Sequence, residues 1–528
     1  MHGRIKVRTS EEEKAKKEKE RQEKLKIFKH AMAKIQNKRK LGELDKEQLD
    51  VTGQVLSSNP DIYTLWNIRR EILIEFRKQL PEEEITKLYD AELSLTEYCL
   101  KINPKSYCAW HQREWVLTTR SDPDWKKEVA LCNTYLKLDE RNFHTWDYRR
   151  FVVSQCKYSL QEEFDYTTEK LLDNFSNYSA WHYRSKMLLD LYPDKEGGRP
   201  IQDSYYKHEL KMVLSAAFTD PDDTSAWFYQ RWLLGAVKTV TKIVVSTVTP
   251  SKTTVAFNHT VPLKYVKENV QIFFNNVNVV GEWFSCVQKQ NDDVWILKHD
   301  QCVNDDLNIK VEHCINGAEK ETLVLSTYKP SYYVGKNIIC FQNKYSTTVL
   351  AELNEQLDAC RQLLEMEPDN KWTLLTTAFF LYCVDAKTYN KEIDKILQSL
   401  IGIDKQRAGY YCDLKSKWSI EKEIHDNYDK MDLEMKVAVK NLTCLPRLQY
   451  YSFCENVDLS HQNLNENVLP SLIKLQHCKK LNLSYNKITT LRKFPLFQLE
   501  ELDLKGNDID NSDIEELKNK YKNIKIIL

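Results

Sequence analysis

The sequence feature that most constrains the fold is a short unit that recurs in tandem. Its clearest copy spans Asn103–Arg113 and reads NPKSYCAWHQR, and a close copy spans Asn59–Arg69. The tryptophans of successive copies stand 44, 36, 35 and 46 residues apart. They are Trp66, Trp110, Trp146, Trp181 and Trp227. A tandem unit of this length predicts stacked pairs of helices.

The residue types within the unit suit a helix that begins inside it. An Asn or Asp before proline fits the turn that precedes a helix, and proline fits the first helical turn. The aromatic residue three before each tryptophan, for example Tyr107 or Phe143, is predicted to share the helical face of that tryptophan. The arginine three after it, for example Arg113, can bond carbonyls or carboxylates of the next helix pair. Taken alone, the pattern indicates the packing of one repeat on the next.

Changes in composition divide the rest of the chain. The first 50 residues are dense in charge and predict a solvated helix. Between about residues 239 and 345, short runs rich in Val, Thr, Ile, Phe and Tyr predict seven or eight strands and a β-sandwich. A degraded sixth repeat then follows at Pro368–Trp372, without the arginine. The strands are therefore interpreted as an insertion between the fifth and sixth helix pairs.

The last 90 residues have a different repeat, with the segments VDLSHQNL, LNLSYNKI and LDLKGNDI. Asn463, Asn486 and Asn507 are 23 and 21 residues apart. This spacing predicts leucine-rich repeats, in which each asparagine side chain bonds backbone groups after a strand. The sequence as a whole predicts a multidomain, mainly α-helical chain. It has a helical superhelix over 1–237 and 346–440, a β-sandwich over 238–345 and leucine-rich repeats over 441–528.

Composition narrows the function. Lys plus Arg and Asp plus Glu are 77 each, so nothing favours a nucleic acid or an acidic partner. The 14 cysteines include no C-x-x-C pair, which is typical of a reduced, cytoplasmic protein, and no apolar run is long enough to span a bilayer. The sequence contains no phosphate-binding loop, dinucleotide motif, hydrolase motif or cluster of metal ligands. Such a chain is either a scaffold or one half of an enzyme.

The unit N-P-x-x-Y-x-x-W-x-x-R resembles the repeat of the protein prenyltransferase α-subunits. Copies 59–69 and 103–113 fit it best, whereas the fifth has Thr224 for the aromatic residue and Gln230 for the arginine. In this family, the animal α-subunits of the enzymes that modify Rab GTPases add an immunoglobulin-like insert and C-terminal leucine-rich repeats. This sequence has both additions in that order. The farnesyltransferase α-subunit lacks them, and we disfavour that alternative.

The resemblance implies one subunit of a heterodimer. A β-subunit would hold Zn²⁺ and the lipid pocket, and the substrates would be geranylgeranyl diphosphate and a Rab GTPase that an escort protein presents. Lys105 and Tyr107 of the second repeat and His144 of the third are implied to stabilise the diphosphate leaving group. His2 is a candidate contact to the zinc of the partner; the alternative is a terminal segment with no such role.

One departure from the family pattern concerns substrate choice. Enzymes that recognise a short C-terminal CaaX peptide have a glutamine directly after the tyrosine, and here that position is Cys108. A thiol binds a carboxylate poorly, so the sequence predicts no direct CaaX recognition. The alternative from another class is a noncatalytic scaffold for protein–protein interaction. In that case Lys105 is an exposed loop lysine, Tyr107 has no catalytic role, and His144 is a hydrogen-bonded packing residue.

Overall fold

The computed structural model describes residues 11–156, 158–194, 201–235, 240–304, 306–315, 319–337, 341, 345–430, 432–436, 439–495, 499–521 and 524–528. Its contacts divide the chain into two compact units, 1–191 and 192–528. None of the described helices combines the length and the apolar content that a bilayer crossing needs.

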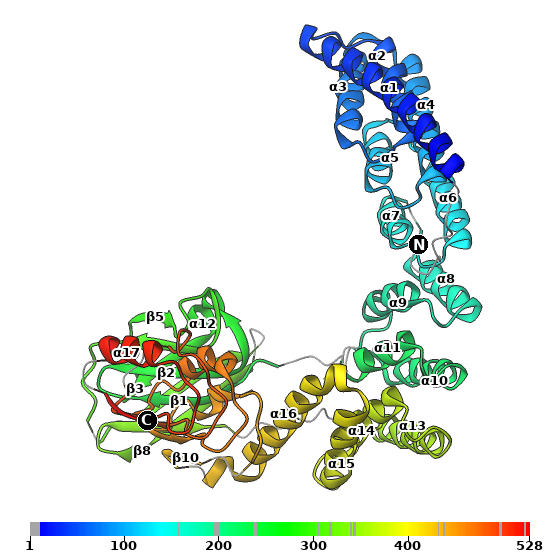
Figure 1. The fold of residues 1–528 in the computed structure, drawn as a ribbon. Helices are drawn as coiled ribbons and strands as arrows, with labels where there is room; N and C mark the ends of the chain where they lie inside the picture. Colours follow the sequence, from blue (N-terminus) through cyan, green and yellow to red (C-terminus); the bar gives the residue numbers. More distant parts are fainter. Residues whose placement is uncertain are drawn as a thin grey trace. The chain divides into compact units, whose positions relative to one another are not determined.

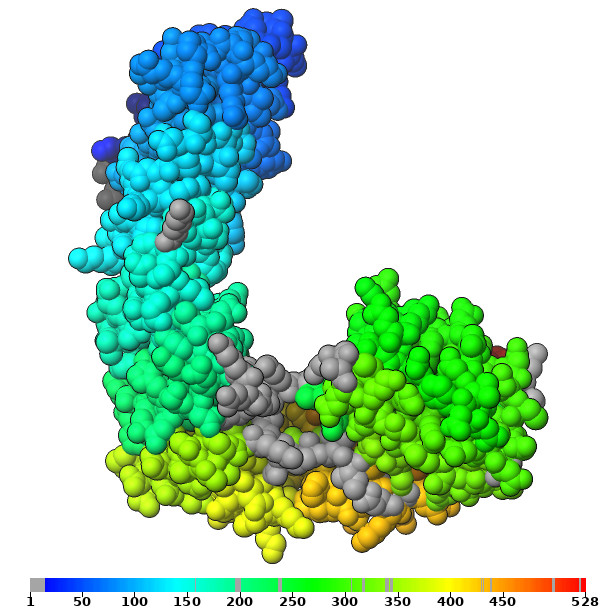
Figure 2. Space-filling view, turned by 180° about the vertical axis from the view of Figure 1, so that it is seen from behind, coloured from blue at the N-terminus to red at the C-terminus, as the bar shows by residue number. Residues whose placement is uncertain are grey.

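Unit 1 is a stack of helix pairs (Figure 1), and the colours of Figure 2 show that its parts follow one another in sequence order. A long charged helix precedes the first pair. The helices are α1 (Glu11–Leu41), α2 (Lys46–Ser58), α3 (Tyr63–Gln79), α4 (Glu82–Ile102), α5 (Tyr107–Thr119), α6 (Trp125–Leu138), α7 (Phe143–Gln155), α8 (Leu160–Asp173) and α9 (Tyr178–Leu191). The predicted stacking of helix pairs is confirmed, and the tryptophans lie in the core between helices.

The tryptophan of each repeat stabilises the turn before its own helix. Its indole Nε1 donates a hydrogen bond to the carbonyl oxygen six residues earlier, at 2.8–3.0 Å in all five repeats. The Asn or Asp just before that carbonyl accepts the N–H two residues further on, again in all five. The third and fourth repeats keep this geometry with Glu140 and Phe175 in place of proline. The turn therefore depends on the Asx side chain and the indole, and proline is dispensable.

Three buried ion pairs join successive repeats of unit 1. Arg113 donates through Nε and Nη2 to the two carboxylate oxygens of Glu128, at 2.6 and 2.7 Å. Two further pairs have the same geometry: Arg69–Glu92 and Arg149–Glu163. The prediction that these arginines bond the next helix pair is confirmed. Two-point pairing of this kind offsets the cost of burying both charges.

Unit 2 continues the helix pairs. Its helices are α10 (Asp203–Thr219), α11 (Thr224–Gly235), α13 (Thr347–Met366), α14 (Lys371–Asp385), α15 (Asn390–Ile403) and α16 (Ala408–Asn427) (Figure 1). α13 packs on α10, and α14 packs on α11, although more than 100 residues separate the two pairs in sequence. The phenolic oxygen of Tyr345, just before α13, donates to the carbonyl of Leu234 in α11 at 3.2 Å.

The residues between these helix pairs form one curled antiparallel sheet. Nine strands are described, where the sequence predicted seven or eight. They are β1 (Ile243–Val248), β2 (Lys252–Pro262), β3 (Val270–Phe274), β4 (Val277–Asn278), β5 (Glu282–Ser285), β6 (Asn291–Lys298), β7 (Ile309–Ile315), β8 (Glu319–Lys329) and β9 (Tyr332–Lys336), with α12 (Leu263–Asn269) between β2 and β3. The strand order is β4-β3-β7-β8-β9-β1-β2-β6-β5. The first part of β8 pairs with β7 and its end pairs with β9, so hydrogen bonding is continuous through β8.

The C-terminal part forms a parallel sheet of short strands. They are β10 (Glu434–Lys436), β11 (Asn456–Asp458), β12 (Lys480–Asn482), β13 (Glu501–Asp503) and β14 (Lys525–Ile527), and α17 (Asn511–Lys520) lies before the last. Asn486 and Asn507 bond backbone groups between successive turns, as predicted. The prediction for Asn463 was wrong, because Gln462 bonds the N–H of Leu442 at 2.9 Å and the carbonyl of Val439 at 2.8 Å. A glutamine one position earlier therefore has the role of the asparagine.

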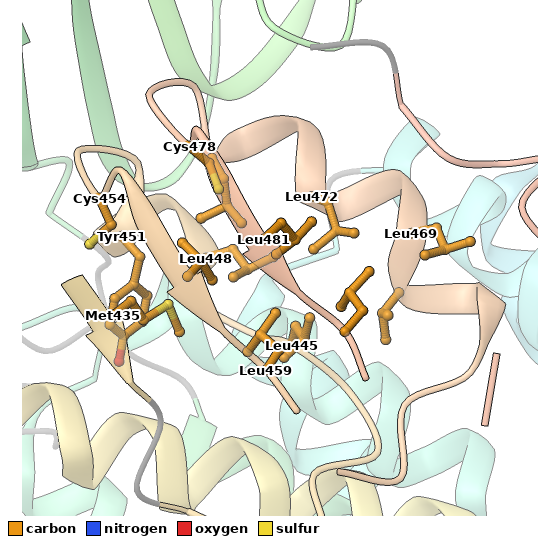
Figure 3. Packing of buried hydrophobic residues seen from close by; sticks show 14 of the residues in the cluster. Met435, Leu445, Leu448, Tyr451, Cys454, Leu459, Leu469, Leu472, Cys478 and Leu481 are labelled. Carbon is orange, nitrogen blue, oxygen red and sulfur yellow. The ribbon is translucent and has the colours of Figure 1, made fainter. Parts of the chain in front are cut away.

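The antiparallel and parallel sheets share one hydrophobic core, which the sequence did not predict. Valines of β1 and Tyr332 of β9 belong to the same buried cluster as the leucines of the parallel sheet. Figure 3 shows part of this cluster, with Leu448, Leu459 and Leu481 packed between the short strands and the segment Glu466–Lys474. The phenolic oxygen of Tyr332 donates to the carbonyl of Phe453 at 2.8 Å. The two sheets are therefore parts of one packed body.

Candidate functional site

The site predicted from the sequence lies where the second and third repeats of unit 1 adjoin. Asn103 ends α4, and its side chain accepts the N–H of Lys105 at 3.1 Å. Ser106 then caps α5, which begins at Tyr107. This turn places Lys105 and Tyr107 at the positive end of a helix. Both side chains are exposed, and that of Tyr107 has 67% of its surface accessible.

His144 comes from the next repeat and contacts the tyrosine. It is the second residue of α7, is buried, and meets the ring of Tyr107 edge to face with centroids 4.2 Å apart. The exposed ring of Phe143 also lies against the imidazole, with centroids 4.0 Å apart, and is 6.2 Å from the ring of Tyr107. The structure therefore brings Tyr107 and His144 together, although 37 residues separate them in sequence.

Electrostatics at this site favour an anionic ligand. Lys105 Nζ lies 3.9 Å from Asp139 Oδ2, at the limit of an ion pair, and both groups are largely exposed. Such a contact is weak in water, so an incoming polyanion can displace it. Burial lowers the pKa of His144, and the charge of Lys105 lowers it further, against the opposing effect of Asp147. The imidazole is therefore neutral at pH 7, which leaves one N–H available as a donor.

Cys108 occupies the position after the tyrosine and has no carboxylate-binding geometry. Its side chain is half-buried, and its sulfur lies 3.9 Å from the backbone carbonyl oxygen of Asp61. Burial raises the pKa of this thiol, and Asp61 raises it further. A neutral thiol that faces a carbonyl oxygen offers nothing to a peptide carboxylate.

The aromatic residues three before the tryptophans are exposed, whereas the tryptophans are buried. They were predicted to share a helical face with the tryptophans, and each is the first residue of its helix and is exposed over half or more of its surface. These residues are Tyr63, Tyr107, Phe143 and Tyr178. The helix begins at these positions, so no preceding turn covers them. The first four repeats therefore each present one exposed ring, and those of the second and third repeats belong to the candidate site.

Within the described ranges, no group of three or more His, Cys, Asp or Glu side chains could hold a metal ion. His2 lies outside the described residues. Sequence reasoning missed Asp139, which faces Lys105. Its place in the Asx turn of the third repeat was the available signal, since the turn at Asn103 has the same geometry.

The five repeats match a known protein family. A family model described as "Protein prenyltransferase alpha subunit repeat" matches residues 45–76, 89–120, 125–156, 160–191 and 206–237. These ranges hold the five tryptophan repeats, so the class of protein is that of prenyltransferase alpha subunits.

Relatives extend the match beyond the repeats. The geranylgeranyl transferase type-2 subunit alpha of Sus scrofa is 37% identical over 96% of this chain and 91% of its own length. The Homo sapiens protein of the same name is 36% identical over 93% of this chain and 88% of its own length. The Saccharomyces cerevisiae protein of that name is 39% identical over 36% of this chain and 58% of its own length. The chain belongs to the family of type-2 geranylgeranyl transferase alpha subunits.

Proposed function

We propose that this chain is the α-subunit of a heterodimeric enzyme that transfers geranylgeranyl from geranylgeranyl diphosphate to C-terminal cysteines of Rab GTPases. An escort protein presents the Rab substrate. Near full-length similarity to alpha subunits that carry this transferase name supports the proposal. The observation that carries it is the exposed pair Lys105 and Tyr107, of which the tyrosine ring lies against a neutral, buried His144.

The proposed contribution of this chain is to stabilise the leaving group. In the transfer, a bond forms between the cysteine sulfur and C1 of the lipid. The C1–O bond breaks, and its electron pair leaves with the diphosphate. Lys105 supplies a positive charge to the oxygens as that charge develops, and the Tyr107 hydroxyl donates a hydrogen bond to them. His144 holds the tyrosine ring in place and can donate an N–H to the same anion.

Other elements of the enzyme are proposed to come from partner proteins. A β-subunit would hold Zn²⁺, which activates the substrate thiol when bound; the described residues of this chain include no suitable ligand cluster. The exposed rings at Tyr63, Tyr107, Phe143 and Tyr178 suit a protein interface, since aromatic residues are enriched there. Cys108 favours one of the two substrate classes. A thiol at this position fits a Rab substrate that an escort protein delivers better than it fits a CaaX peptide.

We further propose the domain limits 1–237 with 346–440 for the helical part, 238–345 for an immunoglobulin-like insert and 441–528 for leucine-rich repeats. A cytoplasmic location fits the reduced cysteines.

The decisive experiment is a single-turnover assay on the reconstituted heterodimer with a Rab–escort complex. Lys105→Ala should lower the transfer rate roughly 10²–10³-fold, because one charge-stabilising group is lost. Lys101→Ala is the matched control, since Lys101 is also exposed, lies nearby in sequence and pairs with Glu97. Size-exclusion chromatography should show equal assembly for both variants.

Two other outcomes would contradict parts of this proposal. A normal rate for Lys105→Ala would exclude Lys105 from the site. A wild-type chain that binds no β-subunit would instead favour a noncatalytic scaffold.

A further inference from the structure

One buried side chain joins the two turns that form the candidate site. Asn142 caps α7, and its Oδ1 accepts the N–H of His144 at 3.1 Å. Its Nδ2 donates to the carbonyl oxygen of Pro104 in the preceding repeat, also at 3.1 Å. Pro104 stands directly before Lys105. One amide therefore bonds both the segment that carries Lys105 and the first turn of the helix that carries His144.

The carbonyl of Pro104 is held by two donors. Besides the amide of Asn142, it accepts the indole N–H of Trp110 at 3.0 Å. A carbonyl oxygen has two lone pairs, so these two bonds fill its capacity. The indole ties the turn to its own helix, α5, whereas the amide ties it to the next repeat. Asn142 is 2% exposed, so water competes little for its bonds. The backbone at Lys105 is therefore fixed relative to α7.

The side chain of Lys105, by contrast, is weakly held. It is 64% exposed, and its ion pair with Asp139 spans 3.9 Å. Exposed pairs of this kind contribute little in water. The fold therefore controls where this flexible side chain leaves the backbone. That control matters for catalysis, because a displacement of about 1 Å at a reacting group can cost roughly 10²-fold in rate.

The same position in neighbouring repeats separates capping from bridging. Ser106 caps α5, and its hydroxyl donates to the carbonyl of Pro60 at 3.3 Å. Asn177 caps α9, where its Oδ1 accepts the N–H of Ala180 at 3.1 Å. The Nδ2 of Asn177 is buried and has no partner within the part of the chain that the structure describes. Asn177 is therefore a cap without a bridge, which makes it a matched control for Asn142.

We propose that Asn142 is a positioning residue of the site: it holds Lys105 in register with His144, so that both act on the same diphosphate. This role rests on the proposed function of Lys105 and assigns the residue that places it. Asn142 acts through these neighbours, since its amide is buried and bonded within the chain.

The test compares single-turnover transfer by the reconstituted heterodimer with Asn142→Ala and with Asn177→Ala. Each substitution removes one helix cap, so both should lower the thermal midpoint by about 2–4 °C. Asn142→Ala also removes the bond to Pro104. Its transfer rate should fall roughly 10-fold, because the flexible lysine can follow only part of the displacement. Asn177→Ala should keep the rate within about twofold of wild type, because no bridge is lost. Size-exclusion chromatography should show equal assembly of both variants.

Two further variants distinguish positioning from a general structural role. In a Lys105→Ala background, Asn142→Ala should lower the rate by no more than about twofold, because the group that it positions is gone. The fall in the thermal midpoint should remain in that background. Asn142→Ser introduces the residue type that makes the bridge in the second repeat, where Ser106 bonds the equivalent carbonyl. It should return the rate to within about threefold of wild type.

Three results would overturn the positioning role. Equal rates for Asn142→Ala and Asn177→Ala would show that the bridge does not affect the site. A further loss of roughly 10-fold in the Lys105→Ala background would mean that Asn142 acts independently of Lys105. An Asn142→Ser variant that regains the thermal midpoint but not the rate would exclude the bond to Pro104 as the cause. In each case a slow Lys105→Ala enzyme would leave the proposed function intact. A normal rate for Lys105→Ala would instead reject the site itself, and the role of Asn142 with it.

Discussion

The helical repeats of unit 1 and the two joined sheets of unit 2 bury polar groups in different ways. In the repeats, the buried polar groups include ionised pairs, such as Arg149 with Glu163. In the sheets, buried or half-buried histidines bond hydroxyls through Nε2. These bonds join His299 to Thr253 at 3.1 Å, His313 to Tyr265 at 2.8 Å and His477 to Thr247 at 2.8 Å.

The ion pairs of the repeats and the histidine bonds of the sheets respond differently to pH. The hydrogen bonds that Arg149 donates to Glu163 raise the pKa of Arg149 against the effect of burial, so this pair stays ionised across the neutral range. Burial lowers the pKa of His313 to about 4 and that of His477 well below its usual value. The nearby Lys252 and Lys329 lower the pKa of His477 further. The sheets therefore depend on neutral imidazoles, whereas the repeats depend on charge.

The largest expected effect is in the repeats. Arg149→Met should cost about 3–5 kcal/mol of local stability, because Glu163 is then buried without its partner. Hydrogen exchange of the α7 and α8 amides would measure this loss. The double variant Arg149→Met with Glu163→Leu should recover most of it. Equal losses in the single and double variants would show that the pair is not what stabilises this contact.

Acid should affect the sheets more than the repeats. In the unfolded chain, His313 and His477 bind protons below about pH 6.5, whereas in the folded chain their lowered pKa values keep them neutral. The free energy of unfolding therefore falls as pH drops from about 7 towards 4. At pH 5 the loss is roughly 2 kcal/mol for each histidine. Hydrogen exchange at pH 7.5 and 5.0, corrected for intrinsic rates, should show early opening of β1 and β2. The variant His477→Gln should reduce that acid sensitivity; an unchanged profile would argue against His477 as a source.

A smaller effect is expected where the two sheets meet. Tyr332→Phe removes the hydroxyl that bonds the carbonyl of Phe453 and should cost about 1 kcal/mol. Urea unfolding followed by tryptophan fluorescence would measure the change. If the sheets fold as one body, both should open at the same lowered urea concentration. Separate transitions for the two sheets would contradict the shared core.

The smallest effect is expected for an exposed ion pair, which serves as the reference for the buried pairs. Lys87 pairs with Glu83 on the surface of α4, and both side chains are at least 70% exposed. Lys87→Ala should leave the urea midpoint unchanged within error, because water screens such pairs. A clear loss would mean that exposed pairs, and not only buried ones, stabilise the repeats.

Several features of the candidate site could be predicted and others could not. The motif located Lys105 and Tyr107 at the start of a helix, and the structure has them there. The exposure of the aromatic series was not predicted, because face sharing with a tryptophan three residues later does not show where the helix begins. The role of Gln462 was also missed, because glutamine and asparagine can make the same backbone bonds from neighbouring positions.

The sequence by itself determined the repeats, because their defining bonds are local. An indole reaches a carbonyl six residues back and an Asx side chain reaches an N–H two residues on, so residue spacing is enough to predict them. Only the tertiary structure decided which charges are paired and which surfaces are joined. Thr247 meets His477 across 230 residues, and the Tyr332 hydroxyl donates to the carbonyl of Phe453 across 121 residues. Such contacts depend on how elements pack in space, and no spacing along the chain encodes them.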